Sequence, residues 1–389
     1  MAEPHPKLGC MPLNVLIAGG GVAGLEACFA LRDLAGDRVH CTLLTPEREF
    51  VYRPMAVAEP FARGVAQHRA LEQIAADAGA SLMHGKLARV DDPAQLAITT
   101  EGAELPYDAL IVAIGAGSEP AFPHGLTWTP ESDDEVFGGL LRDIEEGYVK
   151  QVAFVVPVGV AWALPAYELA LMTAWEADSM GQRDVSVTIY TPETAPLQAF
   201  GLAAGAAVRE DLEEARVQIE TDAAVHTNEH GFIVDPGARA LPGRVVALPR
   251  AVGTPVAGLP NDARGFIRVD AHGKVSGTAN VWAAGDAIAF PIKQGGLAAQ
   301  QAVAAAQSIA ARAGADVQPE PFKPVLRGVL LTGRGKAWLR RADEGAEGET
   351  ERRALFWPPT KIAGRYLSPY LAGEPVTAPP GQLVDLDLR

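Results

Sequence analysis

The chain has 389 residues and a formal net charge of −15, with 48% hydrophobic and 21% charged residues. This length suffices for two or three domains, and the composition is that of an ordinary globular protein. The negative charge argues against nucleic acid or an anionic membrane as a main partner. No apolar run reaches the length of a transmembrane helix, and residues 1–13 show no signal-peptide core. We therefore expect a cytoplasmic protein with at most peripheral membrane contact.

A strand, a glycine-rich turn and a helix are predicted near the start of the chain. Residues 15–18 are apolar and suit a buried parallel strand, and residues 25–34 are helical in pattern. Between them Gly19, Gly21 and Gly24 have the spacing G-x-G-x-x-G. In this setting the glycines allow, in turn, a tight turn, close approach to a pyrophosphate and close helix–strand packing. The sequence thus predicts a dinucleotide site at a helix N-terminus.

Such a site normally has an acidic residue about twenty positions on, at the end of the second strand, that binds a ribose hydroxyl. Residues 39–44 are the predicted strand, and Thr45-Pro46-Glu47 follows it. Thr45 occupies the expected position, and Glu47 is the nearest carboxylate. A turn at Pro46 would bring Glu47 back, so we favour Glu47 as the ribose contact, with a surface loop glutamate as the alternative.

Two further motifs lie downstream. Residues 107–115 read Tyr-Asp-Ala-Leu-Ile-Val-Ala-Ile-Gly, and residues 281–284 form a short predicted strand that ends in Gly285-Asp286. An alanine-rich helix is predicted from about residue 295 to 313, since alanine favours helices and no proline interrupts the segment.

Together the three motifs resemble, in sequence and order, those of the FAD-dependent pyridine nucleotide-disulfide oxidoreductase superfamily. The resemblance implies an α/β fold of two Rossmann-like dinucleotide-binding domains plus a C-terminal cap, with non-covalent FAD. It implies that the glycine fingerprint binds the ADP half of FAD and that Gly115, Gly285 and Asp286 are further cofactor contacts. The start of the long helix, at Gly296 and Leu297, would point at the flavin and stabilise its reduced form.

The same resemblance divides the chain into three parts. It predicts a discontinuous FAD-binding domain at 10–125 and 255–320, and an NAD(P)-binding-like domain at 126–254. The C-terminal cap would comprise residues 321–389.

The second nucleotide unit is expected to have the fold without a normal binding motif. After an apolar strand at 151–156, the turn has a single glycine, Gly159, with two prolines and the bulky Trp162. Such a turn would keep the backbone away from a pyrophosphate. The next strand, 185–190, ends in Thr-Pro-Glu like the second strand of the first unit, which suggests an internal duplication.

The altered turn is similar to that of sulfide:quinone oxidoreductases and flavocytochrome sulfide dehydrogenases. Those proteins carry a catalytic cysteine in this loop, roughly where Trp162 stands. No cysteine follows Cys41 here, and Cys28 and Cys41 are predicted to be buried structural thiols. The third cysteine, Cys10, lies in the N-terminal arm, and no Cys-x-x-Cys pair exists. We therefore expect no redox-active dithiol and no cysteine persulfide chemistry, and the scattered histidines suggest no metal site.

The start of the long helix is similar to type II NADH:quinone dehydrogenases. Residues 295–301 partly match their quinone motif, which makes Gln300 and Gln301 quinone contacts, with exposed helical glutamines as the alternative. In relatives, a glutamate at the position of Glu168 acts in proton relay, and Lys293 would draw electron density toward the flavin. A helix-stabilising carboxylate and a solvent lysine are the structural alternatives.

Aromatic residues mark two more candidate positions. Tyr52 and Arg53 follow the second strand, where relatives approach the flavin, and Arg53 could contact phosphate or substrate. Trp357 lies in an aromatic C-terminal segment that in relatives caps the flavin and forms a quinone entrance. Packed aromatics and a surface arginine are the alternatives.

The sequence thus predicts an FAD-dependent oxidoreductase that passes two electrons from a small donor to an acceptor such as a quinone. One alternative is an NAD(P)H dehydrogenase of the type II kind. The other is a non-catalytic FAD-binding sensor or assembly protein. A homodimer is left open.

Overall fold

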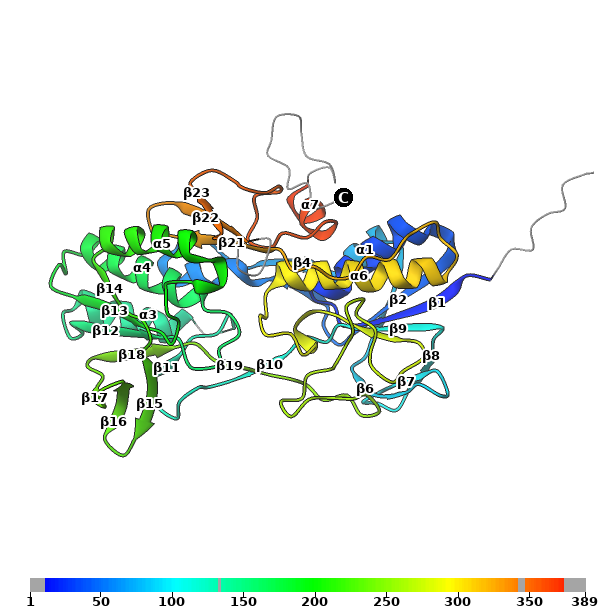
Figure 1. Ribbon diagram of the computed structural model, residues 1–389, viewed down its shortest axis with the longest axis horizontal. Coiled ribbons are helices and arrows are strands. Elements are labelled where there is room, and N and C mark those ends of the chain that lie inside the picture. Colours follow the sequence, from blue (N-terminus) through cyan, green and yellow to red (C-terminus); the bar gives the residue numbers. More distant parts are fainter. Residues whose placement is uncertain (1–10, 132–133, 342–346, 374–389) are drawn as a thin grey trace, which may run out of the picture.

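The computed structural model describes residues 11–131, 134–341 and 347–373. Two five-stranded parallel sheets lie toward opposite ends of the molecule, and a C-terminal antiparallel sheet lies along the same side as their covering helices (Figure 1). The two parallel sheets confirm the predicted two Rossmann-like units. Cys10 lies outside the described residues, and the exact domain boundaries stay predictions.

The first sheet carries the glycine fingerprint at the end of its central strand, β1 (Leu13–Ala18). Its order is β20-β9-β1-β2-β5, and every neighbouring pair is parallel. Residues 15–18 are all buried because helices cover one face and a small antiparallel sheet lies near the other. The remaining strands are β2 (Val39–Thr45), β5 (Ala80–His84), β9 (Ala109–Val112) and β20 (Val281–Ala283).

Helices α1 (Val22–Ala35) and α6 (Gly295–Arg312) pack side by side on this sheet (Figure 1). Their contact is rich in fully buried alanines, whose small side chains let the helix axes come close. Other elements around this sheet are β3 (Glu49–Tyr52), β4 (Gln67–Ala70), α2 (Leu71–Asp77), β6 (Leu87–Asp91), β7 (Leu96–Thr99) and β8 (Glu104–Pro106), with 3-10 turns at 36–38, 53–61 and 285–287.

The second sheet has the order β11-β18-β12-β13-β14 and is also parallel throughout. Its helices are α3 (Asp134–Glu145), α4 (Leu164–Ser179) and α5 (Leu202–Glu214). Its strands are β11 (Leu126–Thr127), β12 (Gln151–Val155), β13 (Ser186–Tyr190), β14 (Val217–Glu220) and β18 (Arg244–Ala247). A short ladder of β10 (Gly117–Glu119) with β19 (Arg250–Val252) connects the two units, and β15 (Ala224–Asn228), β16 (Gly231–Asp235) and β17 (Arg239–Ala240) form a separate small sheet.

The C-terminal part consists of the antiparallel strands β21 (Leu326–Leu331), β22 (Lys336–Arg341) and β23 (Glu349–Glu351), followed by α7 (Leu367–Ala372). In α1, Glu26 is fully buried and accepts hydrogen bonds from the backbone N–H groups of Tyr366 (3.0 Å) and Leu367 (2.8 Å). Burial raises the pKa of Glu26, and these two donors counteract the rise. The phenols of Tyr366 and Tyr370 donate to Asp33 (2.9 Å) and Asp77 (2.7 Å). The C-terminal segment is thereby fastened to the first unit.

Among the helices of the described ranges, none combines the length and the apolar character that a membrane crossing requires.

Candidate active site

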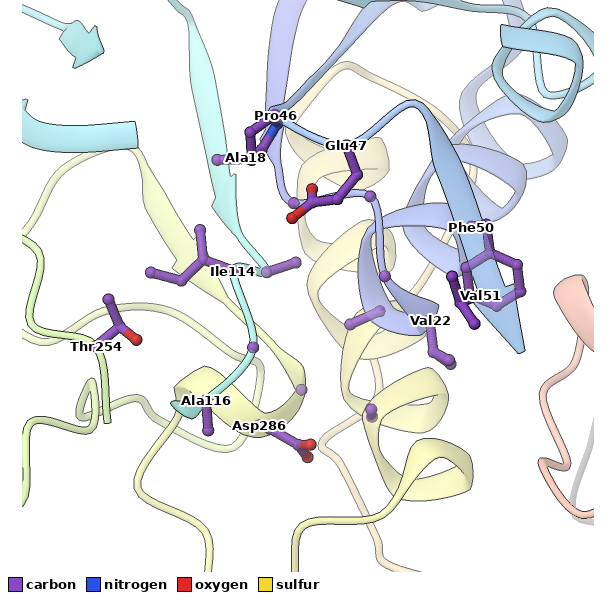
Figure 2. A pocket seen from close by; sticks show the side chains of 18 of the residues that line it. Ala18, Val22, Pro46, Glu47, Phe50, Val51, Ile114, Ala116, Thr254 and Asp286 are labelled. Atoms are coloured by element: carbon purple, nitrogen blue, oxygen red, sulfur yellow. The ribbon is translucent and has the colours of Figure 1, made fainter. Parts of the chain in front are cut away.

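A cavity of about 580 Å³ opens at the carboxyl ends of β1, β2 and β9 (Figure 2). Ligands of open parallel sheets bind at this edge. The three motifs found in the sequence meet here, together with a segment from the far end of the chain. The walls comprise residues 18–23, Leu44, Pro46, Glu47, residues 49–51, Arg53, residues 85–87 and 113–116, Thr254, Gly285, Asp286, Gly295, Ala298 and Ile362.

The three glycines of the fingerprint have different neighbours. Gly19 has φ +120°, and a Cβ there would overlap the carbonyl oxygen of Ala113, which directly follows β9. A Cβ at Gly24 would overlap the carbonyl oxygen of Gly19. A Cβ at Gly21 would meet no protein atom within 4 Å. The protein's own packing thus requires the first and third glycines, whereas the second leaves room that only a ligand in the cavity would use.

The carboxylate after β2 turns back over the glycine loop. Thr45 is fully buried, and its hydroxyl donates to Glu47 Oε2 at 2.5 Å. Glu47 lines the cavity, and its carboxylate points toward the loop (Figure 2). The turn at Pro46 therefore has the predicted geometry, with Thr45 positioning the carboxylate. Ribose binding by Glu47 stays a prediction.

The middle and late motifs form the opposite wall. Gly115 has φ +74° and no protein atom within 4 Å of a Cβ, so it too borders open space. Gly285 has φ +75°, and its N–H donates to Gln301 Oε1 at 2.9 Å. Asp286 follows and lines the cavity. Burial raises the pKa of Asp286, and the positive charge of Lys293 counteracts the rise.

At the start of α6 the residues that line the cavity flank the predicted cofactor contacts Gly296 and Leu297, which stay predictions. Gly295 and Ala298, which are three apart on one helix face, line the cavity, whereas Gly296 and Leu297 do not. Leu297 is buried in the hydrophobic core instead. Gln294, which was not predicted, caps the helix by accepting a hydrogen bond from the Leu297 N–H at 2.9 Å.

The three residues predicted to contact quinone are engaged elsewhere. Gln300 makes two hydrogen bonds of 2.9 Å with the backbone N–H and C=O of Val325. Gln301 holds the Gly285 turn, and Trp357 is buried and does not line the cavity. Their roles are those of positioning and packing, because their polar groups or faces are already covered by the protein. We therefore do not propose them as quinone contacts.

Glu168 forms a buried ion pair next to the cavity. Lys361 Nζ lies 2.6 Å from Glu168 Oε1 and 2.8 Å from Oε2, and the two side chains are 9% and 1% exposed respectively. The Leu331 N–H also donates to Oε1, at 2.9 Å. Burial raises the pKa of Glu168 and lowers that of Lys361, and in each case the partner's charge opposes the shift. Ile362, the neighbour of Lys361, lines the cavity.

Lys293 lies behind the cavity wall rather than in it. Its ammonium group donates to the Ile288 carbonyl and lies 3.8 Å from the centroid of the Phe266 ring. Burial lowers its pKa to about 8, and Asp286 opposes the shift. Lys293 thus acts on the cavity through the charge of Asp286.

At the rim, Arg53 lines the cavity and forms a 3.1 Å ion pair with Glu131, both exposed. The Tyr52 hydroxyl accepts a hydrogen bond from the Ile362 N–H at 3.1 Å. Tyr52 therefore ties the rim to the C-terminal segment; it does not line the cavity.

The two described cysteines have no access to the cavity. Cys28 is fully buried, and burial raises its pKa well above the usual value. Burial also raises the pKa of Cys41, to about 12. Neither thiol is poised to become a nucleophilic thiolate.

Lys86, Thr254 and Ile362 are among the lining residues that sequence reasoning missed. Lys86 follows β5, and the rule that ligands bind at the carboxyl edge of parallel strands could have found it. Thr254 and Ile362 carry no local motif, and only the tertiary fold brings them to the cavity.

The chain matches a known protein family over most of the residues that form this cavity. The model of the family described as pyridine nucleotide-disulphide oxidoreductase matches residues 13–308, most of the chain. The chain belongs to this family. Members are FAD-dependent oxidoreductases, and FAD is the cofactor. The open space at Gly21 and Gly115 and the exposed glycine loop at a helix N-terminus fit a dinucleotide of this kind.

Individual relatives are more distant. A sulfide-quinone reductase of Aquifex aeolicus is 26% identical over 198 residues, which cover 47% of this chain and 44% of that protein. The chain thus spans less than half the length of this relative. The crystal structure of the sulfide:quinone oxidoreductase from Aquifex aeolicus matches with a TM-score of 0.77 at 20% identity, over 87% of this chain and 86% of that one. A ferredoxin reductase from Rhodopseudomonas palustris matches with a TM-score of 0.62 at 19% identity, over 84% and 81%. At these identities the structures show the fold.

Proposed function

We propose that this family member passes two electrons from a small donor, through FAD, to an acceptor such as a quinone, without a redox-active dithiol. The observation that carries the proposal is the cavity at which all three motifs converge. A flavin supplies reversible uptake of two electrons when bound. The protein's part is to hold it, exclude water and manage protons.

The cavity residues suit the parts of the cofactor in a consistent order. The N–H groups of the glycine loop and the dipole of α1 favour the pyrophosphate, and Glu47 favours the ribose hydroxyls. Asp286 would accept a hydrogen bond from the ribityl side, and the N-terminus of α6 at Gly295 would face the flavin end. Arg53 at the rim is free to contact a phosphate if it leaves its exposed partner Glu131.

Glu168 and Lys361 are the candidate proton carriers. Burial raises the pKa of Glu168 and lowers that of Lys361, which reduces the energetic cost of moving a proton between the two groups. Lys361 directly precedes Ile362, which lines the cavity. Proton balance at the flavin would therefore run through this pair, which deepens the proton-relay role predicted for Glu168.

The donor reacts without attachment to a cysteine of the described chain. The similar sequence and the similar crystal structure, both from Aquifex aeolicus, are named for sulfide and quinone, and this supports small inorganic donors and a quinone acceptor as the first to be tried. Because Cys28 is buried, Cys41 is half-buried and both have raised pKa values, a persulfide on either is not proposed.

The test is an anaerobic half-reaction study. The purified protein should show a flavin spectrum, bleach with a small donor such as sulfide, and recover its colour on addition of a short-chain ubiquinone, with dithionite as the reference for full reduction. Rapid bleaching by NADH would instead favour the NAD(P)H dehydrogenase alternative. Tight flavin that only dithionite reduces would favour the sensor alternative. The cytoplasmic location and a homodimer stay predictions.

A further inference from the structure

The second parallel sheet has its own candidate nucleotide edge, which the proposed function does not use. Thr191-Pro192-Glu193 follows β13, as Thr45-Pro46-Glu47 follows β2 in the first sheet. In both places the threonine hydroxyl donates to the glutamate, at 2.9 Å and 2.5 Å respectively. The duplication predicted from the sequence is thus repeated in side-chain geometry.

The two glutamates differ in what they face. Glu47 is exposed on a cavity, whereas Glu193 is 9% exposed. The Tyr167 hydroxyl donates to Glu193 Oε2 at 2.6 Å, and the Gln198 N–H donates to Oε1 at 3.2 Å. Tyr167 is fully buried in the first turn of α4, the helix whose N-terminus would receive a pyrophosphate. Both carboxylate oxygens that would bind a ribose are therefore occupied by the protein.

The segment after Glu193 is folded down over this edge. The Leu197 N–H donates to the Tyr167 hydroxyl at 3.2 Å, and Leu197 has φ +46°, a left-handed conformation that is strained for leucine. We call Tyr167, Thr191, Glu193, Leu197 and Gln198 the Tyr167 clasp. It holds the segment in place against this strain.

The closed segment also supports the C-terminal sheet. Phe200 packs edge-on against Trp162 of the altered turn, with ring centroids 5.7 Å apart. On the other side, a Cβ at Gly328 of β21 would lie 2.6 Å from the Phe200 ring, and one at Gly348 would overlap the Phe200 carbonyl oxygen. The sheet β21–β22–β23 thus rests directly on the segment that closes the edge.

We infer that the Tyr167 clasp excludes pyridine nucleotides from the second sheet, and that Tyr167 and Glu193 are specificity-determining residues for the electron donor. A dinucleotide ribose could reach Glu193 only by displacing the phenol. That would leave the Tyr167 hydroxyl and the Leu197 N–H buried without partners, which is costly. The second Rossmann unit serves as a support for the C-terminal sheet. The inference deepens the proposed function, since it names which donors are rejected and by which side chains.

The test measures binding and exchange rather than turnover. Isothermal titration of the holoprotein with NADH, NADPH and ADP-ribose, each to about 1 mM, should give no binding. Hydrogen exchange should show protected amides at Leu197 and Gln198. Tyr167→Phe keeps the ring and removes the hydroxyl, so exchange at these amides should accelerate about tenfold. The matched control Tyr190→Phe changes a buried phenol on β13 outside the clasp and should leave that exchange unaltered.

Two results would overturn the inference. One is binding of any of the three nucleotides with protection of residues 191–201 from exchange. The other is unchanged exchange in Tyr167→Phe. If Tyr167→Phe does not fold, Glu193→Gln gives the same reading at Gln198, because an amide is a weaker acceptor than a carboxylate. Flavin content and reduction by small donors do not enter these readouts, so failure of the proposed function would be seen separately.

Discussion

Replacing Lys361 with methionine is expected to destabilise the protein by about 3–5 kcal/mol at neutral pH, because it leaves a buried carboxylate without its counter-ion. The ammonium group lies within 2.8 Å of both oxygens of Glu168, and the carboxylate side chain is only 1% exposed. The remaining donor, the Leu331 N–H, contributes about 1.5–3 kcal/mol as a hydrogen bond to a charged group and is already present in the parent protein. It therefore cannot compensate for the loss.

The effect should depend on pH in a defined direction. Burial already raises the pKa of Glu168 above its unfolded value, and removing Lys361 removes the main opposing charge. A group with a raised folded pKa stabilises the fold at low pH and loses that contribution as the pH rises through the folded pKa. The Lys361→Met variant should therefore lose less stability at pH 5 than at pH 7.

Urea unfolding of the FAD-loaded protein at the two pH values measures this effect. The double variant Glu168→Gln, Lys361→Met should recover most of the loss, since a neutral amide can still accept from Leu331 N–H. Lys323→Met, which changes an exposed lysine just before β21, is the matched control and should change stability by less than about 0.5 kcal/mol. A loss below about 1 kcal/mol for Lys361→Met, or a double variant less stable than the single one, would refute the reasoning.

Three other predictions follow from described contacts. Gly21→Val should abolish FAD binding with little change in the melting temperature of the apoprotein. The control Gly139→Ala, at an open position in α3, should keep the flavin spectrum and add about 0.5–1 kcal/mol of stability. Full flavin content in Gly21→Val would show that FAD binds elsewhere. With the N-terminal arm cysteine replaced by serine, iodoacetamide at pH 8 should leave Cys28 and Cys41 unlabelled in the folded protein and label both in urea, as mass spectrometry would show; rapid labelling of the folded protein would contradict the burial argument. Burial lowers the pKa of Lys293 from 10.5 to about 8, so its buried charge opposes folding most strongly below pH 8, and this penalty falls as the pH rises from about 8 toward 10.5. Lys293→Met should therefore be more stable than the parent at pH 7, and by a smaller margin at about pH 9.5, in urea titrations; a difference independent of pH would exclude this cause.

The sequence predicted those parts of the fold that local patterns determine. The apolar run at 15–18 became β1, and the three glycines lie at its carboxyl end, because the turn demands conformations and close contacts that only glycine allows. The Thr45-Pro46-Glu47 turn was also read correctly, because proline limits the geometry that it can adopt. The loss of glycines at the second turn indicated an altered nucleotide site, although the Tyr167 clasp itself could not be foreseen.

Sequence patterns determined neither which side of a helix faces the cavity nor which distant segment a side chain contacts. One residue along a helix turns a side chain by about 100°, so Gly296 and Leu297 were chosen where Gly295 and Ala298 line the cavity. A glutamine on a helix does not reveal its partner, and the amide of Gln300 is bound to the backbone of a segment that follows the helix. In the same way Glu168 was recognised from its place on a helix, but its partner lies 193 positions away in sequence.

The walls of the cavity come from residue 18 at one extreme and Ile362 at the other. During synthesis the glycine loop leaves the ribosome before the strand that carries the late motif, and the wall residue Ile362 follows both. The hydrogen bonds that fasten the C-terminal segment to Glu26 cannot form before Tyr366 and Leu367 have been synthesised. A nascent chain can therefore form the cradle for the pyrophosphate long before it can enclose the cofactor. Enclosure of the cofactor therefore cannot be complete until the chain has been made beyond residue 362.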